Sequence, residues 1–412
     1  MTKRFVLFIK VFLLIFVISF LYWAEYKTFN QRKDLIPTEL KNDLFLKDKT
    51  FNNEEIIDED KEDYFSLEKR YVRNFLNEKE KQLYDSFLVN SLKHISSFNI
   101  IPIKEESLQN VYRAFMNDNP DHFWVDNLVY YTNSNTNQVI KIDFKFNVDE
   151  KEKEKRQEEI DQVVKEILAP INKEMTEYDQ VKYIYDYIID NTIYDYQAPD
   201  NQNIYSVLIN GRSVCAGYAR TFQYLMNKLD IFNLYVTGTT TTEDNQTLGH
   251  AWNLVRLDNQ FYNIDSTWGN SIFITDQSLN NYKNYHYFNV TSEEIKKTHI
   301  FDAYYPLPEA KGLKYNYYIK EKLLFTVYDL NLENRLYERL IEINEEKDPL
   351  LTISFTNKKE YQKALEQLFD KGKLFKLIKQ SNKSNKNKVN ERIVKSSSNE
   401  EKLIIDIYLN YI

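Results

Sequence analysis

Residues 210–222 read NGRSVCAGYARTF, and this stretch decides how the rest of the chain is interpreted. It contains Cys215, the only cysteine among 412 residues. The Asn210-Gly211 pair is typical of a break in regular structure, and the apolar spacing after it predicts a helix that begins near Ser213 or Val214. The N-terminus of a helix favours negative charge, and a thiol reacts as its thiolate. A lone cysteine is nevertheless more often a small buried residue. Cys215 by itself therefore does not indicate a catalytic nucleophile, and a base and an orienting residue must be found for it.

The composition of the whole chain excludes several classes of protein. Hydrophobic residues make up 42% and charged residues 28%, which is typical of a globular protein with a sizeable core. The net charge of -8 argues against a nucleic-acid-binding protein, which is usually basic. One cysteine forms neither an internal disulfide nor a paired-cysteine zinc site. No metal or nucleotide motif is present, so we expect no metal and no cofactor.

The first 27 residues have the pattern of a membrane segment. Lys3 and Arg4 form a basic end, and the 20 residues from Phe5 to Ala24 contain one charge, Lys10. A helix of that length spans a bilayer core of about 30 Å. We predict an uncleaved signal anchor, a single transmembrane helix that leaves the main body outside the cytoplasm. The alternative is a cleaved signal peptide, although the apolar run ends in Tyr-Trp-Ala-Glu, a poor cleavage site.

The pattern after this segment predicts four further regions. They are a polar linker over 28–65, an α+β region over 66–170, a central domain over 171–310, and a C-terminal α+β region over 311–412. In the first α+β region, alternating residues predict a hairpin, and 150–168 reads as a helix. In the last region, the basic stretch 371–395 is predicted to be a solvated loop, and contact of its charge with an anionic cell surface is the less favoured interpretation.

One of the five histidines stands apart from the others. His250 opens the strand HAWNLVRL, which the turn pair Asp258-Asn259 connects to a second strand, QFYNIDSTW. The remaining four are interpreted as surface or satisfied polar residues, because they lie in polar segments: His94, His122, His286 and His299.

The length of the turn in this hairpin determines which side chains lie on the same face of the sheet. If Asp258-Asn259 is a two-residue turn, Trp252 faces Asp265 on the opposite strand. His250 then faces Thr267, and all four side chains share one side of the sheet. His250 and Asp265 become diagonal neighbours with Cβ atoms about 7 Å apart, within reach of an imidazole–carboxylate hydrogen bond. A loop with an odd number of residues would separate them.

These residues form a cysteine, histidine and aspartate set of the kind that activates a nucleophile. The segments GRSVCAGYARTFQYLMNKLDI and GHAWNLVRLDNQFYNIDSTWGN resemble the transglutaminase-like superfamily of papain-like thiol proteins, over about Tyr178 to Asn270. The resemblance implies an α+β core in which a helix with the cysteine packs on an antiparallel sheet with the histidine and aspartate. It implies Cys215 as nucleophile, His250 as base and acid, and Asp265 as the residue that orients His250. The flanks NDNPDHFWV and YFNVTSEEIKKTHIFDAYYPLP resemble those of extracytoplasmic proteins of Gram-positive bacteria.

The chemistry that this resemblance implies is acyl transfer or amide hydrolysis on a cell-surface protein or a peptidoglycan peptide. The oxyanion would be held by the Cys215 backbone N–H and an upstream donor, for which Tyr205 is a candidate; the competing interpretation of Tyr205 is helix-face packing. Trp252 and Trp268 are interpreted as packing that shields the site. The sequence leaves transglutamination and hydrolysis open, and it leaves a second class open, a non-catalytic surface scaffold that keeps the fold for binding.

Overall fold

The computed structural model describes residues 70–241, 247–270 and 283–412. All described residues belong to one compact unit. The transmembrane helix expected in 1–27 and the linker expected in 28–65 lie outside the described residues. Within the part of the chain that is described, no helix is long and apolar enough to cross a membrane.

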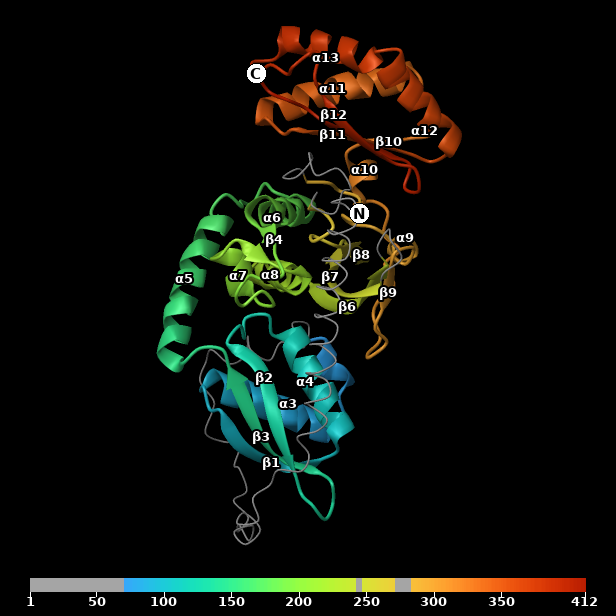
Figure 1. Ribbon diagram of the computed structural model, residues 1–412. Coiled ribbons are helices and arrows are strands. Elements are labelled where there is room, and N and C mark those ends of the chain that lie inside the picture. Colours follow the sequence, from blue (N-terminus) through green and yellow to red (C-terminus); the bar gives the residue numbers. More distant parts are fainter. Residues whose placement is uncertain (1–69, 242–246, 271–282) are drawn as a thin grey trace, which may run out of the picture. The chain divides into compact units, whose positions relative to one another are not determined.

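The first described region is a three-stranded antiparallel sheet with two helices (Figure 1). Its elements are the 3-10 turn η4 (Val72–Phe75), α3 (Glu78–Leu92), β1 (Ser97–Ile103), α4 (Glu105–Asp118), β2 (Val125–Thr132) and β3 (Val139–Phe146). The strand order is β1-β3-β2, and β2 and β3 are the predicted hairpin. Helix α3 begins where Asn77 and Glu80 form a capping box, so the start of this helix is encoded locally.

The central region holds the residues singled out from the sequence. Its helices are α5 (Glu150–Leu168), α6 (Glu177–Asn191), α7 (Ile204–Leu208), α8 (Cys215–Lys228) and α9 (Ser292–Ile295). Its strands are β4 (Ile193–Tyr194), β5 (Arg212–Ser213), β6 (Asn233–Thr241), β7 (Thr247–Leu257), β8 (Gln260–Ile264) and β9 (His299–Phe301). The larger sheet has the order β8-β7-β6-β9, with every pair antiparallel, and α8 packs on β6 and β7 (Figure 1).

The hairpin β7–β8 has the predicted register. Leu257 pairs with Gln260, and Asp258 and Asn259 both have positive φ angles, 47° and 59°, as a two-residue turn of type I′ requires. Strand β8 ends at Ile264, however, so the expected strand residue Thr267 lies in a turn. The Asp265 carboxylate causes this ending, because its Oδ1 accepts the Thr267 backbone N–H at 2.9 Å and takes that group out of the ladder.

The C-terminal region is a second mixed α/β arrangement (Figure 1). Its helical elements are α10 (Tyr317–Lys320), α11 (Leu330–Glu346), α12 (Lys358–Leu365), the π-helical turn η7 (Glu366–Asp370) and α13 (Lys373–Ser384). Its strands are β10 (Leu324–Phe325), β11 (Leu350–Phe355), β12 (Lys395–Asn399) and β13 (Ile404–Tyr408), in the order β10-β11-β13-β12. The basic stretch 371–395 is therefore not simply a loop, because Leu374 and Ile378 bury one face of helix α13.

Candidate active site

Cys215 is the first residue of α8, and the chain before it is held in place from two sides. Strands β4 and β5 form a short parallel pair, in which the Asp195 backbone N–H donates to the Ser213 carbonyl at 2.8 Å. On the other side, a Cβ atom on Gly217 would lie 1.9 Å from Ser213 Oγ and 3.1 Å from the Asn201 carbonyl oxygen. Glycine at position 217 thus lets the preceding loop lie directly on the first turn of the helix. The thiol at this helix start is only partly buried.

His250 and Asp265 lie within hydrogen-bonding distance, as the hairpin parity predicts. His250 Nε2 is 2.8 Å from Asp265 Oδ2, and both side chains are almost fully buried. The other side of the imidazole interacts with the thiol of Cys215. The helix start and the hairpin therefore bring the predicted cysteine, histidine and aspartate together in one site.

The electrostatics of the pair follow from burial and from opposite charge. Burial alone would lower the pKa of His250, but the charge and the hydrogen bond of Asp265, helped by the Cys215 side chain, raise that pKa to about 10. Burial alone would raise the pKa of Asp265, but His250 and then His299 outweigh it and hold that pKa below its ordinary value. At neutral pH the site therefore contains an imidazolium and a carboxylate.

A second histidine contacts the same carboxylate, and sequence reasoning missed it. His299 Nε2 lies 3.2 Å from Asp265 Oδ2, and the His299 side chain is fully buried. The predicted interpretation of His299 as a surface or satisfied polar residue was therefore incomplete, because its partner is a residue of the site. Nothing local in the segment THIF indicates this contact, which depends on the pairing of β9 with β6.

Other positions of the two sequence motifs have structural roles around these groups. The buried Asn253 of β7 donates from Nδ2 to the Ala219 carbonyl of α8 at 2.9 Å, which ties the hairpin to the helix that carries the thiol. Trp252 and Trp268 both lie against the His250 ring, with centroids 6.1 and 5.9 Å away. Both rings are therefore neighbours of the imidazole, and the shielding role expected for them stays a prediction.

The expected oxyanion donor Tyr205 lies in a different environment. Its hydroxyl donates to Glu159 Oε2 at 2.7 Å, and Arg156 covers its ring at 4.3 Å from the centroid. Tyr194 of β4 lies beside Cys215 instead, and its hydroxyl is in hydrogen-bonding contact with the Cys215 backbone. Burial first, and then the charge of Cys215, raises the pKa of Tyr194. Sequence reasoning did not select Tyr194.

Three ligand-type atoms of the site are close enough to be examined as a metal centre. One atom each of His250, Asp265 and His299 lies within 4.8 Å of the others. Both imidazole Nε2 atoms, however, are directed at the same carboxylate oxygen at hydrogen-bonding distances. We interpret the cluster as a hydrogen-bonded group, in which those nitrogen atoms carry protons and offer no lone pair to a metal.

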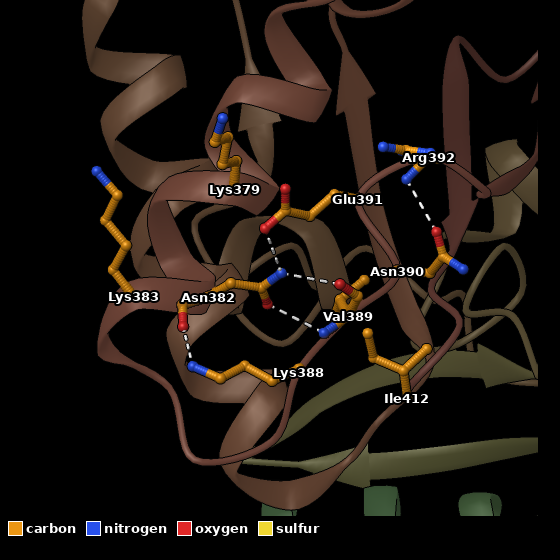
Figure 2. Close-up of a pocket in the computed structure, with 9 residues that line it drawn as sticks. All are labelled: Lys379, Asn382, Lys383, Lys388, Val389, Asn390, Glu391, Arg392 and Ile412. Atoms are coloured by element: carbon orange, nitrogen blue, oxygen red, sulfur yellow. Dashed lines mark hydrogen bonds between the residues drawn. The ribbon is translucent and has the colours of Figure 1, made fainter.

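Two cavities in the described part of the chain are not lined by Cys215. One, of about 640 Å³, is in the C-terminal region, where the buried Asn382 side chain bridges to Val389 and Glu391 (Figure 2). It is lined by Lys379, Asn382, Lys383, Lys388, Val389, Asn390, Glu391, Arg392 and Ile412. The other, of about 260 Å³, includes Arg220 of α8 in its wall. None of Cys215, His250 and Asp265 lines either cavity.

The comparison with protein families agrees with the geometry. Residues 162–266 match the sequence model of the transglutaminase-like superfamily, so this part of the chain is a transglutaminase-like domain. The match includes Cys215, His250 and Asp265. The resemblance inferred from the sequence motifs is thereby confirmed. A search of curated proteins finds no match to the chain.

Solved structures similar to this chain include a transglutaminase, at 18% identity and a TM-score of 0.25, over 35% of this chain and 44% of that one. A "putative cysteine protease" from Cytophaga hutchinsonii has 14% identity and a TM-score of 0.23, over 34% of this chain and 61% of that one. Menin has 14% identity and a TM-score of 0.23, over 57% of this chain and 52% of that one. The match thus spans less than two thirds of each of these proteins, and the domain assignment rests on the family match.

Proposed function

We propose that this protein is a thiol-dependent enzyme that transfers or hydrolyses an acyl group, with Cys215 as nucleophile. The observation that carries the proposal is the contact of His250 with both partners: its Nε2 lies 2.8 Å from Asp265 Oδ2, and its ring interacts with the Cys215 thiol. A positive imidazolium beside a sulfur at a helix N-terminus favours the thiolate, which is the reactive form.

The proposed reaction has two halves. The Cys215 sulfur attacks the carbonyl carbon of a carboxamide or peptide, and the new C–S bond gives a tetrahedral oxyanion. His250 gives its proton to the leaving nitrogen, the C–N bond breaks, and a thioester remains on the sulfur. Water or an amine then attacks the thioester, His250 takes the proton of this second nucleophile, and the sulfur leaves as thiolate. Asp265 keeps His250 oriented in both halves.

The oxyanion needs donors that face the position of the developing charge. The Cys215 backbone N–H is one donor, because it lies at the free N-terminus of α8. The Tyr194 hydroxyl, which contacts the Cys215 backbone, takes the second role that the sequence had suggested for Tyr205. A substrate carbonyl would replace the contact between Tyr194 and the Cys215 backbone with hydrogen bonds to its own oxygen.

The setting of this reaction is also a proposal. The apolar run Phe5–Ala24 supports a membrane-anchored protein with its enzyme part outside the cytoplasm. In that place a cell-surface protein or a peptidoglycan peptide is the available amide substrate. Fractionation of cells that express the full chain, with protease added to intact cells, tests this setting: protection of the main body from protease contradicts it.

The experiment for the activity traps the acyl-enzyme. The purified protein is incubated with a cell-envelope extract, and the peptide that contains Cys215 is analysed by mass spectrometry. We expect the Cys215 peptide to gain the mass of an acyl group in the wild type, and we expect no such addition in Cys215→Ala. The wild-type acyl-enzyme should accumulate when amines are withheld and the water activity is low, because both acceptors of the acyl group are then scarce. A wild-type thiol that never gains an acyl group, although it reacts with iodoacetamide, would support the non-catalytic scaffold instead.

A further inference from the structure

The carboxylate of Asp265 is held by four donors, and only one of them is His250. Its Oδ1 accepts the backbone N–H groups of Thr267 and Trp268 at 2.9 and 3.1 Å. Its Oδ2 accepts His250 at 2.8 Å and His299 at 3.2 Å. The backbone contacts of Oδ1 come from the turn after β8. Among the described residues, His299 is therefore the one further donor to the oxygen that binds His250.

His299 reaches this place through the sheet. Strand β9 pairs with β6, where Thr240 lies opposite His299 and Gly238 opposite Phe301. A Cβ atom on Gly238 would lie 2.0 Å from the Ile300 carbonyl oxygen, so glycine allows β9 to approach closely. The imidazole is then enclosed by three aromatic rings, with centroid distances of 4.9 Å to Trp252, 4.9 Å to Trp268 and 5.3 Å to Tyr287.

The hydrogen bonds of His299 define its tautomer. An ionised carboxylate only accepts, so the proton between His299 and Asp265 belongs to His299 Nε2. Burial outweighs the charge of Asp265 and lowers the pKa of His299, so the ring is neutral. Its Nδ1 then accepts the hydroxyl proton of Thr298, which lies 2.9 Å away. Tyr287 Oη, 3.0 Å from Thr298 Oγ1, completes a chain of donors that ends on Asp265.

We propose that His299 is a positioning residue of this site, which acts through Asp265 by fixing the oxygen that orients His250. The proposal deepens the function proposed above and rests on it. A buried carboxylate with one imidazole partner rotates or shifts when the charge of that imidazole changes during the reaction. A second, neutral donor on the same oxygen holds the carboxylate in place while His250 gives up and regains its proton.

The test uses the single cysteine as a reporter. Iodoacetamide alkylates only Cys215 among the cysteines of this chain, so the rate of alkylation measures the state of this thiol directly. Five proteins are compared from pH 5 to 9: wild type, His299→Leu, His299→Gln, His250→Ala and His286→Leu. His286 is the matched control, because its Nε2 lies 2.7 Å from Asp406 Oδ2 in a histidine–aspartate pair outside the site.

We expect His299→Leu to slow alkylation at pH 6 to 7 by roughly ten- to hundredfold, the size of a lost hydrogen bond to a charged group. His299→Gln, whose amide donates from a similar position, should restore most of the rate. His286→Leu should keep the wild-type pH profile even where it lowers the melting temperature. The turnover rates of these variants should fall in the same order as their alkylation rates. The change should appear in kcat more than in KM, because a positioning residue acts on His250 through Asp265 and not on the substrate.

Equal alkylation profiles for wild type and His299→Leu, with a slow His250→Ala, would overturn the positioning role while the proposed function stands. Conversely, a shifted profile in His299→Leu without turnover in any protein would refute the proposed function and keep the positioning role. Metal analysis completes the test: we expect no change on dialysis against EDTA. One equivalent of metal in the wild type that is lost in His299→Leu would overturn the hydrogen-bonded interpretation.

Discussion

At the scale of single residues, the site depends on how one carboxylate is used. Asp265 ends strand β8 with one oxygen and binds two imidazoles with the other. The first role is local, because an aspartate side chain that accepts the backbone N–H groups of the next residues is a common turn device. The second role turns His250 into a cation at neutral pH, and it is the step that gives the neighbouring thiol its proposed reactivity.

The raised pKa of His250 predicts a pH dependence of stability. The folded-state pKa of about 10 lies above the ordinary value of 6.5, so the contribution of His250 to the free energy of unfolding is fully present below about pH 6.5. It is lost as the pH rises toward 10, and it amounts to a few kcal/mol, because each tenfold gain in proton affinity corresponds to about 1.4 kcal/mol. Urea unfolding of wild type and His250→Gln from pH 6 to 10 checks this: the stability difference should shrink steadily, and a constant difference contradicts it.

At the scale of elements, the start of α8 is built from a close contact rather than from a capping side chain. Val214 makes no side-chain cap, and the segment 212–214 is held by the pairing of β5 with β4, by Asn201 and by its fit against Gly217. The hairpin β7–β8 supplies the histidine and the aspartate in a register set by its turn. The cysteine and its partners thus come from two elements whose relative position depends on packing between α8 and β7.

Substitution of Gly217 tests the contact at the helix start. Alanine favours helices over glycine by about 1 kcal/mol, yet its Cβ would lie 1.9 Å from Ser213 Oγ, which itself donates to Asn201. We expect Gly217→Ala to lower the free energy of unfolding by roughly 1–3 kcal/mol, the usual cost of overpacking, and to slow alkylation of Cys215. Gly249→Ala is the control, because a Cβ there meets nothing within 4 Å. A Gly217→Ala variant as stable as the control contradicts this account.

At the scale of the whole described unit, the C-terminal region is connected to the central region by buried and partly buried polar contacts. Asp406, in the middle of the buried strand β13, accepts Thr352 Oγ1 at 2.6 Å and lies 2.7 Å from His286 Nε2. Lys402 adds an ion pair with Glu294 at 2.9 Å.

Removal of the Asp406 carboxylate should therefore destabilise the protein strongly. Asp406→Ala leaves the partly buried His286 and the buried Thr352 without their acceptor, which typically costs about 3–5 kcal/mol. The exposed pair of Glu309 and Lys311 is the control, and Glu309→Ala should change stability by less than about 1 kcal/mol. Urea unfolding measures both. A double-mutant cycle with His286→Leu should give a clear coupling energy, and additive effects would contradict a direct role for the pair.

Local patterns predicted much of the fold because they act over a few residues. The helix at Glu150–Leu168 was predicted with these bounds, and the start of α6 is also encoded locally, by the capping box of Thr176 and Asp179. The basic stretch 371–395 was misread, because charged residues hid the apolar face of α13, where Leu374 and Ile378 are buried. The apolar residues of this face follow a helical period, which can be recognised only when their spacing is followed over a longer window of sequence.

The sequence by itself determined the motif around Cys215 and the parity that pairs His250 with Asp265. It did so because a helix start and a two-residue turn are set by neighbouring residues, and strand alternation then carries the register along. Only the tertiary structure decided that His299 joins them and that Tyr194, rather than Tyr205, lies beside the thiol. His299 is 34 residues from Asp265, and it arrives by the pairing of β9 with β6, a choice of sheet order that no local pattern encodes.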